Sequence, residues 1–325
     1  MLRYNLLVVL GPTAVGKTAV AVHAAHAMGG EVISCDSRQV YRGMTIGTGK
    51  DLEEYVVDGV PVPYHLIDIA EAGEQYNVHA YQRDFEAAWR DVTGRGRVPV
   101  LCGGSGMYLE AAVFGYDLLE VPVNAELRQQ MAGMSDEELT AMLRRYKTLH
   151  NHTDTETRRR LERAVEIAVY TSEHILERPP YLDLHPLFVG IGCSREVRRQ
   201  RIADRLEARL KAGMVEEVKG LLDRGLTPPA LAYYGLEYKF VTQYLIGELT
   251  YDEMVSRLLS AIRQFAKRQM TWFRRMERRG ADIHWLDVEV PMDEKLRQID
   301  AWWHMPPESR PGSPAPDVSS ESKKP

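Results

Sequence analysis

The sequence has few cysteines and no long apolar run. Its 325 residues include three cysteines, Cys35, Cys102 and Cys193, and their scattered positions predict neither a disulfide framework nor a zinc site. Every apolar run is far shorter than the roughly 20 residues that a membrane span needs. The N-terminus enters an apolar run almost at once, without the pattern of a signal peptide. We therefore expect a soluble, cytoplasmic, monomeric protein with no membrane partner.

The chain also lacks an overall positive charge. Its 41 Lys and Arg residues and 46 Asp and Glu residues give a formal net charge of −5, which does not indicate a nucleic-acid partner. Positive charge is instead concentrated locally. Between Arg263 and Arg279 there are seven basic residues and one acidic residue, Glu277, on what the periodicity predicts to be a long helix that begins near Tyr251.

This predicted helix has a basic face and an apolar face. One basic stripe, within about 60° at 100° per residue, holds Arg263, Lys267, Arg274 and Arg278. A neighbouring stripe holds Arg268, Arg275 and Arg279. The apolar side holds Ile262, Phe265, Trp272, Phe273 and Met276. Ordinary solvated helix faces mix charges of both signs, so this face favours contact with several RNA phosphates.

A second predicted helix, after a strand over 187–191, carries six arginines between Arg195 and Arg209. Glu196, Asp204 and Glu207 lie among them. Acidic residues at helical spacing pair with arginines, so we expect about half of these arginines to form ordinary pairs on the helix surface.

The strongest motif is a phosphate-binding loop. Residues 11–18 read Gly-Pro-Thr-Ala-Val-Gly-Lys-Thr, between the apolar run 6–10 and a predicted helix over 17–28. The glycines let successive backbone N–H groups point at one anion, Lys17 adds a positive charge, and the Thr18 hydroxyl can bind Mg²⁺. The start of a helix also favours an anion. The motif predicts a phosphate site without identifying the phosphate compound.

Two further predicted strands end at polar residues. The strand over 31–34 leads to Asp36, and the strand over 98–102 breaks at two glycines before Ser105. Ligands of parallel sheets bind at the carboxyl ends of the strands, so these side chains should face the phosphate loop. Asp36 could hold Mg²⁺ through water, act as a general base, or only cap a turn. Ser105 could bind a substrate oxygen or only cap the next helix.

These placements predict an α/β fold of the P-loop NTPase-like, nucleotide-kinase-like type, in which helices flank a parallel sheet. Residues 1–116 form the first part of the core, and 158–290 form the second part with the basic helix. Residues 117–157 form a small helical insert, with helices over 124–131 and 136–146, that is too short and polar to bury a good core and should be mobile. Residues 291–325 form a C-terminal segment, disordered from about 306, where six of the 17 prolines lie.

Several motifs occur in a specific order. They are the phosphate loop at 11–18, Asp-Ser-x-Gln-Val-Tyr-Arg-Gly-Met at 36–44, Ile-Gly-Thr at 46–48, His-Leu-Ile-Asp at 65–68 and Gly-Gly-x-Gly-x-Tyr at 103–108. Two later segments, 159–166 and 266–274, extend the pattern. Over residues 5 to 287 the chain thus resembles the tRNA dimethylallyltransferase family, also called tRNA isopentenyltransferases or IPP transferases.

The resemblance implies a prenyltransferase. Such an enzyme moves the dimethylallyl group from dimethylallyl diphosphate to N6 of the adenosine at tRNA position 37, just 3′ of the anticodon. Diphosphate leaves and N6-isopentenyladenosine forms. The implied partners are dimethylallyl diphosphate and the anticodon stem-loop of tRNA, and the implied cofactor is Mg²⁺.

The resemblance also implies site residues. Asp36 would be the catalytic base, and Lys17 and Ser105 would assist at the reaction centre. The diphosphate would be bound by Gly11, Pro12, Thr13, Ala14, Val15, Gly16, Lys17, Thr18 and Arg201, with Thr18 as the metal ligand. The insert would contact tRNA. The tRNA-binding residues would be Asp36, Ser37, Arg38, Gln39, Arg159, Arg160, Leu161, Glu162, Arg163, Lys267, Arg268, Gln269, Thr271, Trp272 and Arg274. Among them, Gln39 would read an adenine edge.

The chain departs from the usual family pattern at several positions. Thr48-Gly49-Lys50-Asp51 stands where Thr-Ala-Lys-Pro is commoner, and Tyr64-His65 replaces paired histidines. The segment 150–154 lacks the usual His-Pro-Asn-Asp. Glu237 adds a negative charge where the family usually has Gly-Tyr before a basic residue. We expect these changes to affect tRNA docking more than catalysis.

Two other functions share the phosphate loop. An adenylate dimethylallyltransferase would use the same donor and base on a free adenine nucleotide, but that acceptor does not need the basic helix. A P-loop kinase, or a nucleotide-dependent RNA-binding module, would leave the segments 36–41 and 267–274 without a role.

Overall fold

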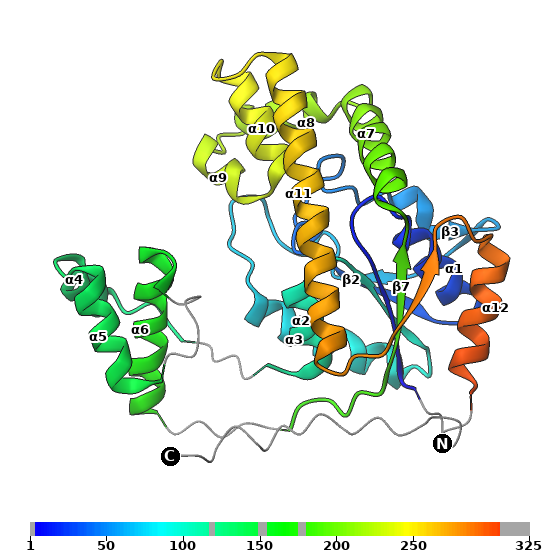
Figure 1. The fold of residues 1–325 in the computed structure, drawn as a ribbon, viewed down its shortest axis with the longest axis horizontal. Helices are drawn as coiled ribbons and strands as arrows, with labels where there is room; N and C mark the ends of the chain where they lie inside the picture. The colour runs from blue at the N-terminus through cyan, green and yellow to red at the C-terminus, as the bar shows by residue number, and fades with distance from the viewer. Residues whose placement is uncertain (1–3, 117–120, 149–154, 175–179, 306–325) are drawn as a thin grey trace. The chain divides into compact units, whose positions relative to one another are not determined.

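A six-stranded parallel sheet forms the centre of the larger of two units (Figure 1). The computed structural model describes residues 4–116, 121–148, 155–174 and 180–305; this unit comprises residues 1–116 and 183–325. The strands, in their order across the sheet, are β5 (Tyr64–His65), β2 (Glu31–Cys35), β6 (Pro99–Gly103), β1 (Leu6–Leu10), β7 (Pro186–Gly192) and β8 (Ile283–Asp287). The three strands β1, β2 and β6 are buried at every position, as is typical of parallel strands covered on both faces. The predicted P-loop-like α/β fold is confirmed.

The register of the sheet aligns the ends of its central strands. Gly103 pairs with both Leu10 of β1 and Cys35 of β2. The segments that follow these three strands are the phosphate loop, the segment at Asp36 and the segment at Ser105, so all three leave the sheet at one edge. The edge is the one at which ligands of parallel sheets bind.

Helices cover both faces of the sheet. On one face α1 (Lys17–Ala27) packs with α12 (Met292–Trp303) and with the short elements η1 (Leu52–Tyr55) and β3 (Val56–Val57). The strand β3 pairs with β4 (Val60–Pro61). On the other face lie α2 (Val78–Gly94) and α3 (Gly106–Phe114), which contact each other. Alternate strand residues such as Leu7, Val9 and Val100 belong to the α1 side, because successive side chains of a strand point to opposite faces.

A second group of helices extends this unit beyond the sheet edge (Figure 1). These helices are α7 (Arg195–Lys211), α8 (Met214–Asp223), α9 (Pro228–Tyr233), α10 (Leu236–Leu245) and α11 (Tyr251–Arg278). They share a core that includes Leu206, Val218, Tyr238 and Leu258. This core also takes in Tyr41 and Met44 from the segment after β2, so the helices hold that segment against the sheet.

The predicted long helix is α11, and it begins at Tyr251 as expected. Thr250 and Glu253 form a capping box that satisfies the first N–H groups of the helix. The buried residues recur every three or four positions and are Met254, Leu258, Ile262, Ala266, Gln269, Phe273 and Met276. The assignment of Phe265 to the packed side was wrong, because its side chain is exposed.

The smaller unit comprises residues 117–182, so it extends beyond the boundary at 157 that the sequence suggested. It contains α4 (Ala125–Ala132), α5 (Asp136–Tyr146) and α6 (Arg158–Glu173). Leu161 and Val165 of α6 pack with Leu139 and Leu143 of α5. The predicted lack of a core was wrong, because α6 supplies apolar residues that had been assigned to the other unit.

The C-terminal segment joins the larger unit through α12. Ile299 and Trp303 are buried in the core on the α1 side of the sheet. The expected disorder from about residue 306, and the segment 150–154, lie outside the described residues. No helix among the described residues is both long enough and apolar enough to cross a membrane.

An ion-pair cluster at the amino end of β2 predicts a pH-dependent stability. Glu31 is 4% exposed, its carboxylate accepts hydrogen bonds from Arg95, and its Oε2 lies 2.7 Å from His65 Nε2. The hydrogen bonds from Arg95 lower the pKa of Glu31 to about 2, although burial opposes them. A depressed carboxylate pKa stabilises the fold above the ordinary pKa, and this contribution is lost as the pH falls toward 2.

We therefore predict that Glu31→Gln lowers the free energy of unfolding by about 2 to 3 kcal/mol at pH 7. The difference from the unmodified protein should shrink between about pH 4.5 and pH 2, as measured by urea unfolding at a series of pH values. Glu86→Gln, which removes an exposed pair with Arg90, is the control and should cost less than about 1 kcal/mol. An equal loss at pH 7 and pH 3 would contradict the linkage.

Candidate active site

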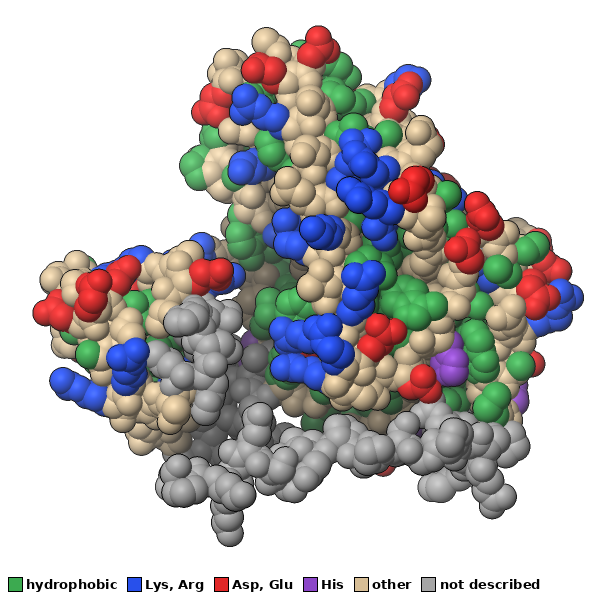
Figure 2. All heavy atoms as spheres, in the orientation of Figure 1, with side chains coloured by type: hydrophobic (Ala, Val, Ile, Leu, Met, Phe, Trp, Pro, Cys, Tyr) green, Lys and Arg blue, Asp and Glu red, His purple; other side chains and the backbone are tan. Residues whose placement is uncertain are grey.

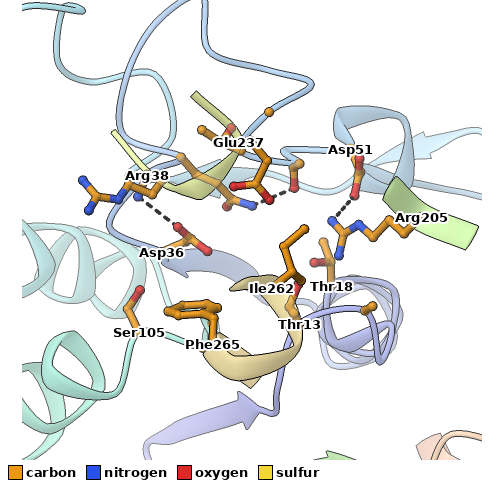
Figure 3. A pocket seen from close by; sticks show the side chains of 18 of the residues that line it. Thr13, Thr18, Asp36, Arg38, Asp51, Ser105, Arg205, Glu237, Ile262 and Phe265 are labelled. Carbon is orange, nitrogen blue, oxygen red and sulfur yellow. Dashed lines mark hydrogen bonds and ion pairs between the residues drawn. The ribbon is translucent and has the colours of Figure 1, made fainter. Parts of the chain in front are cut away.

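A cavity of about 1350 Å³ lies at the carboxyl edge of the sheet, within the larger unit. Its walls are formed by the phosphate loop, the segments that follow β2 and β6, and the helices α7, α10 and α11. Figure 3 shows side chains from these segments around it. The sequence predicted the first three walls, and the helices complete the enclosure.

The phosphate loop occupies the floor of this cavity. Thr13, Ala14, Gly16, Lys17 and Thr18 line it. Burial lowers the pKa of Lys17; Cys102 and Asp36 oppose this effect, and Arg205 and Arg209 add to it. A phosphate group bound here would place a negative charge beside the buried Lys17 ammonium and so offset the cost of burying it. The loop is therefore suited to an anion.

Asp36 and Ser105 lie on neighbouring strand ends, as predicted. Asp36 Oδ1 accepts a hydrogen bond from Arg38 N at 2.9 Å, and the residue lines the cavity. Ser105 Oγ accepts a hydrogen bond from Ser37 N at 3.2 Å. Ser105 is the N-cap residue of α3, but its hydroxyl makes no capping hydrogen bond. The capping interpretation of Ser105 is therefore wrong, and its hydroxyl faces the segment that carries Asp36.

Gln269 connects two of these segments to α11. Its Oε1 accepts from Thr13 N at 2.9 Å, and its Nε2 donates to Gly104 O at 2.9 Å. The side chain is buried, at 7% exposure. Gln269 was predicted to contact tRNA; its observed partners are the phosphate loop and the segment after β6.

Gln39 is engaged in a similar way. Its Oε1 accepts from Ser34 Oγ at 2.8 Å, and its Nε2 donates to Gly49 O at 2.9 Å. The residue lines the cavity but is 9% exposed. Its reading of an adenine edge stays a prediction, and in this structure its amide holds the loop that contains Gly49.

That loop, residues 45–51, forms one wall of the cavity and is held from several sides. Glu217 of α8 accepts hydrogen bonds from the backbone N–H groups of residues 45, 46 and 47 at 2.7 to 3.0 Å. The Lys50 side chain is fully buried; its Nζ donates to Tyr41 O at 2.6 Å and pairs with Asp68. We call residues 45–51 the wall loop.

Three arginines of α7 face the cavity at intervals of four residues. They are Arg201, Arg205 and Arg209. Arg201 Nε donates to Ala14 O of the phosphate loop at 3.0 Å, which places it where a diphosphate ligand was predicted. Arg205 pairs with Asp51 of the wall loop at 2.8 Å. Arg205 and Arg209 were expected only as members of the arginine-rich helix, although a four-residue spacing places them on one helix face with Arg201.

The basic side of α11 is partly confirmed. Figure 2 shows Lys and Arg side chains gathered along this helix. Arg268 lines the cavity and lies 5.9 Å above the Phe265 ring, which also lines it. Trp272 lines the cavity as well, and Lys267, Thr271 and Arg274 are exposed.

Two arginines of the second basic stripe form ion pairs within the protein and do not face solvent as free charges. Glu110 of α3 is fully buried, and Arg275 and Arg279 lie 3.3 and 3.9 Å from its Oε2. Glu277 accepts from Trp285 Nε1 at 2.8 Å. The acidic residue of the segment therefore takes part in packing.

The other predicted tRNA-binding residues lie on α6, in the smaller unit. Leu161 is buried in that unit's core, so its assignment to tRNA is wrong in this structure. Arg160 pairs with Glu156, Arg163 pairs with Glu166, and Glu162 pairs with Arg158. Arg159 is exposed and remains a predicted tRNA contact.

Two family models and several known proteins are similar to this chain. The family model described as IPP transferase matches residues 39–276, and that described as isopentenyl transferase matches residues 4–59. A protein of Bacteroides fragilis named tRNA dimethylallyltransferase 2 is 55% identical over 296 residues, which cover 91% of this chain and 97% of the relative. The chain belongs to the IPP transferase family.

Solved structures agree with this IPP transferase assignment. The tRNA isopentenylpyrophosphate transferase of Bacillus halodurans has a TM-score of 0.67 and 32% identity, covering 92% of this chain and 95% of that one. A eukaryotic dimethylallyltransferase acting on tRNA has a TM-score of 0.76 and covers 91% of this chain and 77% of that one. At 24% identity, this second likeness shows the fold alone.

The IPP transferase cavity has oxygen donors that suit a magnesium ion. The Thr18 hydroxyl and the Asp36 carboxylate both line it, and Mg²⁺ prefers such ligands together with water and substrate phosphates. Among the described residues, no group of three or more His, Cys, Asp or Glu side chains could hold a metal by itself.

The role of Gln269 in this IPP transferase gives a prediction. Gln269→Leu keeps a similar volume but removes both hydrogen bonds, leaving Thr13 N–H and Gly104 C=O unpaired. We expect a loss of about 1 to 3 kcal/mol in stability and weaker binding of pyrophosphate, measured by thermal unfolding and by calorimetric titration. Gln264→Leu, at an exposed position of the same helix, is the control. Unchanged pyrophosphate affinity in a folded Gln269→Leu protein would count against the connecting role.

Proposed function

We propose that this protein is a tRNA dimethylallyltransferase. It transfers the dimethylallyl group from dimethylallyl diphosphate to N6 of the adenosine at tRNA position 37, which gives N6-isopentenyladenosine and diphosphate. The observation that carries the proposal is one cavity that contains both the phosphate loop and Asp36 with Ser105. A site for a diphosphate leaving group and a site for a proton acceptor are thus adjacent, in a chain that belongs to the IPP transferase family.

Asp36 acts as the general base in the proposed mechanism. The N6 lone pair forms a bond to C1 of the dimethylallyl group while the bond from C1 to the diphosphate oxygen breaks. The N6 proton passes to the Asp36 carboxylate. The backbone hydrogen bond from Arg38 to Asp36 Oδ1 fixes the orientation of the carboxylate, and Ser105 lies beside it to bind the amine or the reacting oxygen.

The phosphate loop binds the leaving group. Negative charge grows on the diphosphate oxygens as the bond breaks, and the loop N–H groups, Lys17 and Arg201 are fixed in advance to stabilise it. A Mg²⁺ ion held by Thr18 and the diphosphate would neutralise further charge on these oxygens. Burial of Lys17 strengthens its attraction for the diphosphate, because an ion pair gains more free energy where water is excluded.

The acceptor adenosine enters from the side of α11. A base in a single-stranded loop can leave its stack at a cost of a few kcal/mol and can be held by aromatic side chains. Phe265 is 39% exposed and lines the cavity, so its ring is available to stack on a base. Ser37 and Arg38 are adjacent to Asp36 in the same wall, and Arg38 is itself held 5.2 Å above the Tyr233 ring.

The proposed reaction is tested with labelled donor. We predict that the purified protein, Mg²⁺ and labelled dimethylallyl diphosphate transfer label to N6 of unmodified tRNA beside the anticodon. Asp36→Asn, which preserves the hydrogen bond to Arg38, should lower the rate about 100-fold or more without weakening tRNA binding. Asp58→Asn, at an exposed position, is the control.

Other results would redirect the proposal. Label in AMP but not in tRNA would assign a free adenine nucleotide as the acceptor. Label in neither would remove prenyl transfer and favour a kinase or a nucleotide-dependent binding module. A normal rate in Asp36→Asn with weakened tRNA binding would remove the role of base from Asp36.

The exposed basic residues of α11 give a separate prediction. Lys267 and Arg274 form no ion pair within the described part of the chain, so they are available to phosphates. Lys267→Ala and Arg274→Ala should each weaken tRNA binding and reduce the slope of log Kd against log salt by roughly 0.7 to 1. Arg257→Ala, whose guanidinium pairs with Glu253, is the control. Filter binding at several salt concentrations measures the Kd for tRNA and its salt dependence. Unchanged affinity at low salt would exclude contact of Lys267 or Arg274 with tRNA phosphates.

A further inference from the structure

Three residues from two separate segments meet at one side chain. Gly49 and Asp51 belong to the wall loop, and Glu237 lies in the first turn of α10, far away in the sequence. Arg209 of α7 lies 3.8 Å from Asp51 Oδ2 and 4.0 Å from Glu237 Oε1. All four residues line the cavity.

Gly49 leaves the space that Arg209 occupies. A Cβ added at Gly49 would lie 1.5 Å from Arg209 Nη2 and 2.4 Å from Arg205 Nη2. Gly49 also has φ +62°, a backbone conformation that disfavours other residues. With Arg209 in this position, any side chain at residue 49 would displace the guanidinium.

Asp51 and Glu237 supply the opposite charge. Arg209 is 14% exposed, and burial, followed by the neighbouring Arg205, lowers its pKa. Burial also raises the pKa of Glu237, and Arg209 opposes that change. Burying the charge of Arg209 or of Glu237 alone would thus be costly, and each charge is stabilised by the other. Glu237 neutralises an arginine inside the cavity wall and does not add free negative charge to an RNA surface.

The wall loop is connected in turn to the segment of the proposed base. Gly49 O accepts the hydrogen bond from Gln39 Nε2 at 2.9 Å, and Gln39 lies three residues after Asp36. Figure 3 shows the Asp51–Arg205 pair and Glu237 around the same space as Asp36. A shift of the guanidinium would move Gly49, and through Gln39 it would move the chain that carries Asp36.

We propose that Arg209 is a positioning residue that holds the wall loop, with Gly49, Asp51 and Glu237 as its matched partners. Its buried Nη2 donates no hydrogen bond, and its two long ion pairs connect α7 to the wall loop and to the start of α10. Through these ion pairs it keeps the segment of Asp36 in its place. The inference depends on the proposed function only for the reaction used as one of its measurements.

A double-mutant cycle between Gly49 and Arg209 tests this inference. In the unmodified background, Gly49→Ala should lower kcat about tenfold or more and lower Tm, because the added methyl group displaces the Arg209 guanidinium. In an Arg209→Met background the loss of Tm and of kcat should be smaller, because the nearer of the two guanidinium groups is gone, while the positive φ and Arg205 remain. Gly59→Ala is the control for the backbone strain, since Gly59 has φ +78° and a Cβ there meets no atom within 4 Å.

The single variant Arg209→Met separates positioning from substrate contact. It should lower kcat about tenfold with less than about a twofold change in the KM for tRNA or for dimethylallyl diphosphate. Adding Glu237→Gln should restore part of the lost Tm, because the unpaired buried carboxylate is removed. Arg199→Gln, at an exposed position of α7, controls for the loss of one charge.

Two outcomes would overturn the inference. One is an equal effect of Gly49→Ala on Tm and kcat in both backgrounds. The other is a raised KM with an unchanged kcat in Arg209→Met, which would make Arg209 a substrate ligand. The Tm cycle does not require turnover, so it tests the inference even if the unmodified protein transfers no prenyl group.

Discussion

The site depends on the register of the parallel sheet at Gly103. This residue pairs with the last residue of β1 and the last residue of β2, so the three segments that follow the central strands begin at the same level. The approach is too close for a side chain, since a Cβ at Gly103 would lie 2.0 Å from Cys35 O. A slip of one residue would separate the phosphate loop from Asp36 and turn the buried side chains of the strand to the opposite face.

The helices then fix the segments that the sheet brings together. Gln269 of α11 holds the phosphate loop and the segment after β6, Arg201 of α7 holds the phosphate loop, and Glu217 of α8 holds the wall loop. Each connection pairs a side chain with backbone groups that would otherwise be unsatisfied near the cavity. These contacts set the positions of the phosphate loop, the segment after β6 and the wall loop, which preorganises the cavity before a ligand binds.

The sequence predicted the parts of this arrangement that depend on local pattern. The phosphate loop, the strand ends at Asp36 and Ser105, and the start of α11 at Tyr251 follow from motif and periodicity. Tertiary partners could not be predicted in this way. Gln269 was assigned to tRNA from the family resemblance, and a polar residue on a basic helix gives the same local signal whether it contacts RNA or a loop. Phe265 was assigned to the core because helical angles give a direction and not the location of a cavity.

The smaller unit lies wholly between α3 and β7 in the sequence. Of the residues that the structure describes in this unit (121–148, 155–174 and 180–182), none forms a strand of the sheet or belongs to a helix that lines the cavity. The free energy of closing an inserted segment rises only slowly with its length. Mutation and selection can therefore lengthen, shorten or replace this unit while the catalytic framework stays intact, so the family can diversify in this segment at little cost to its chemistry.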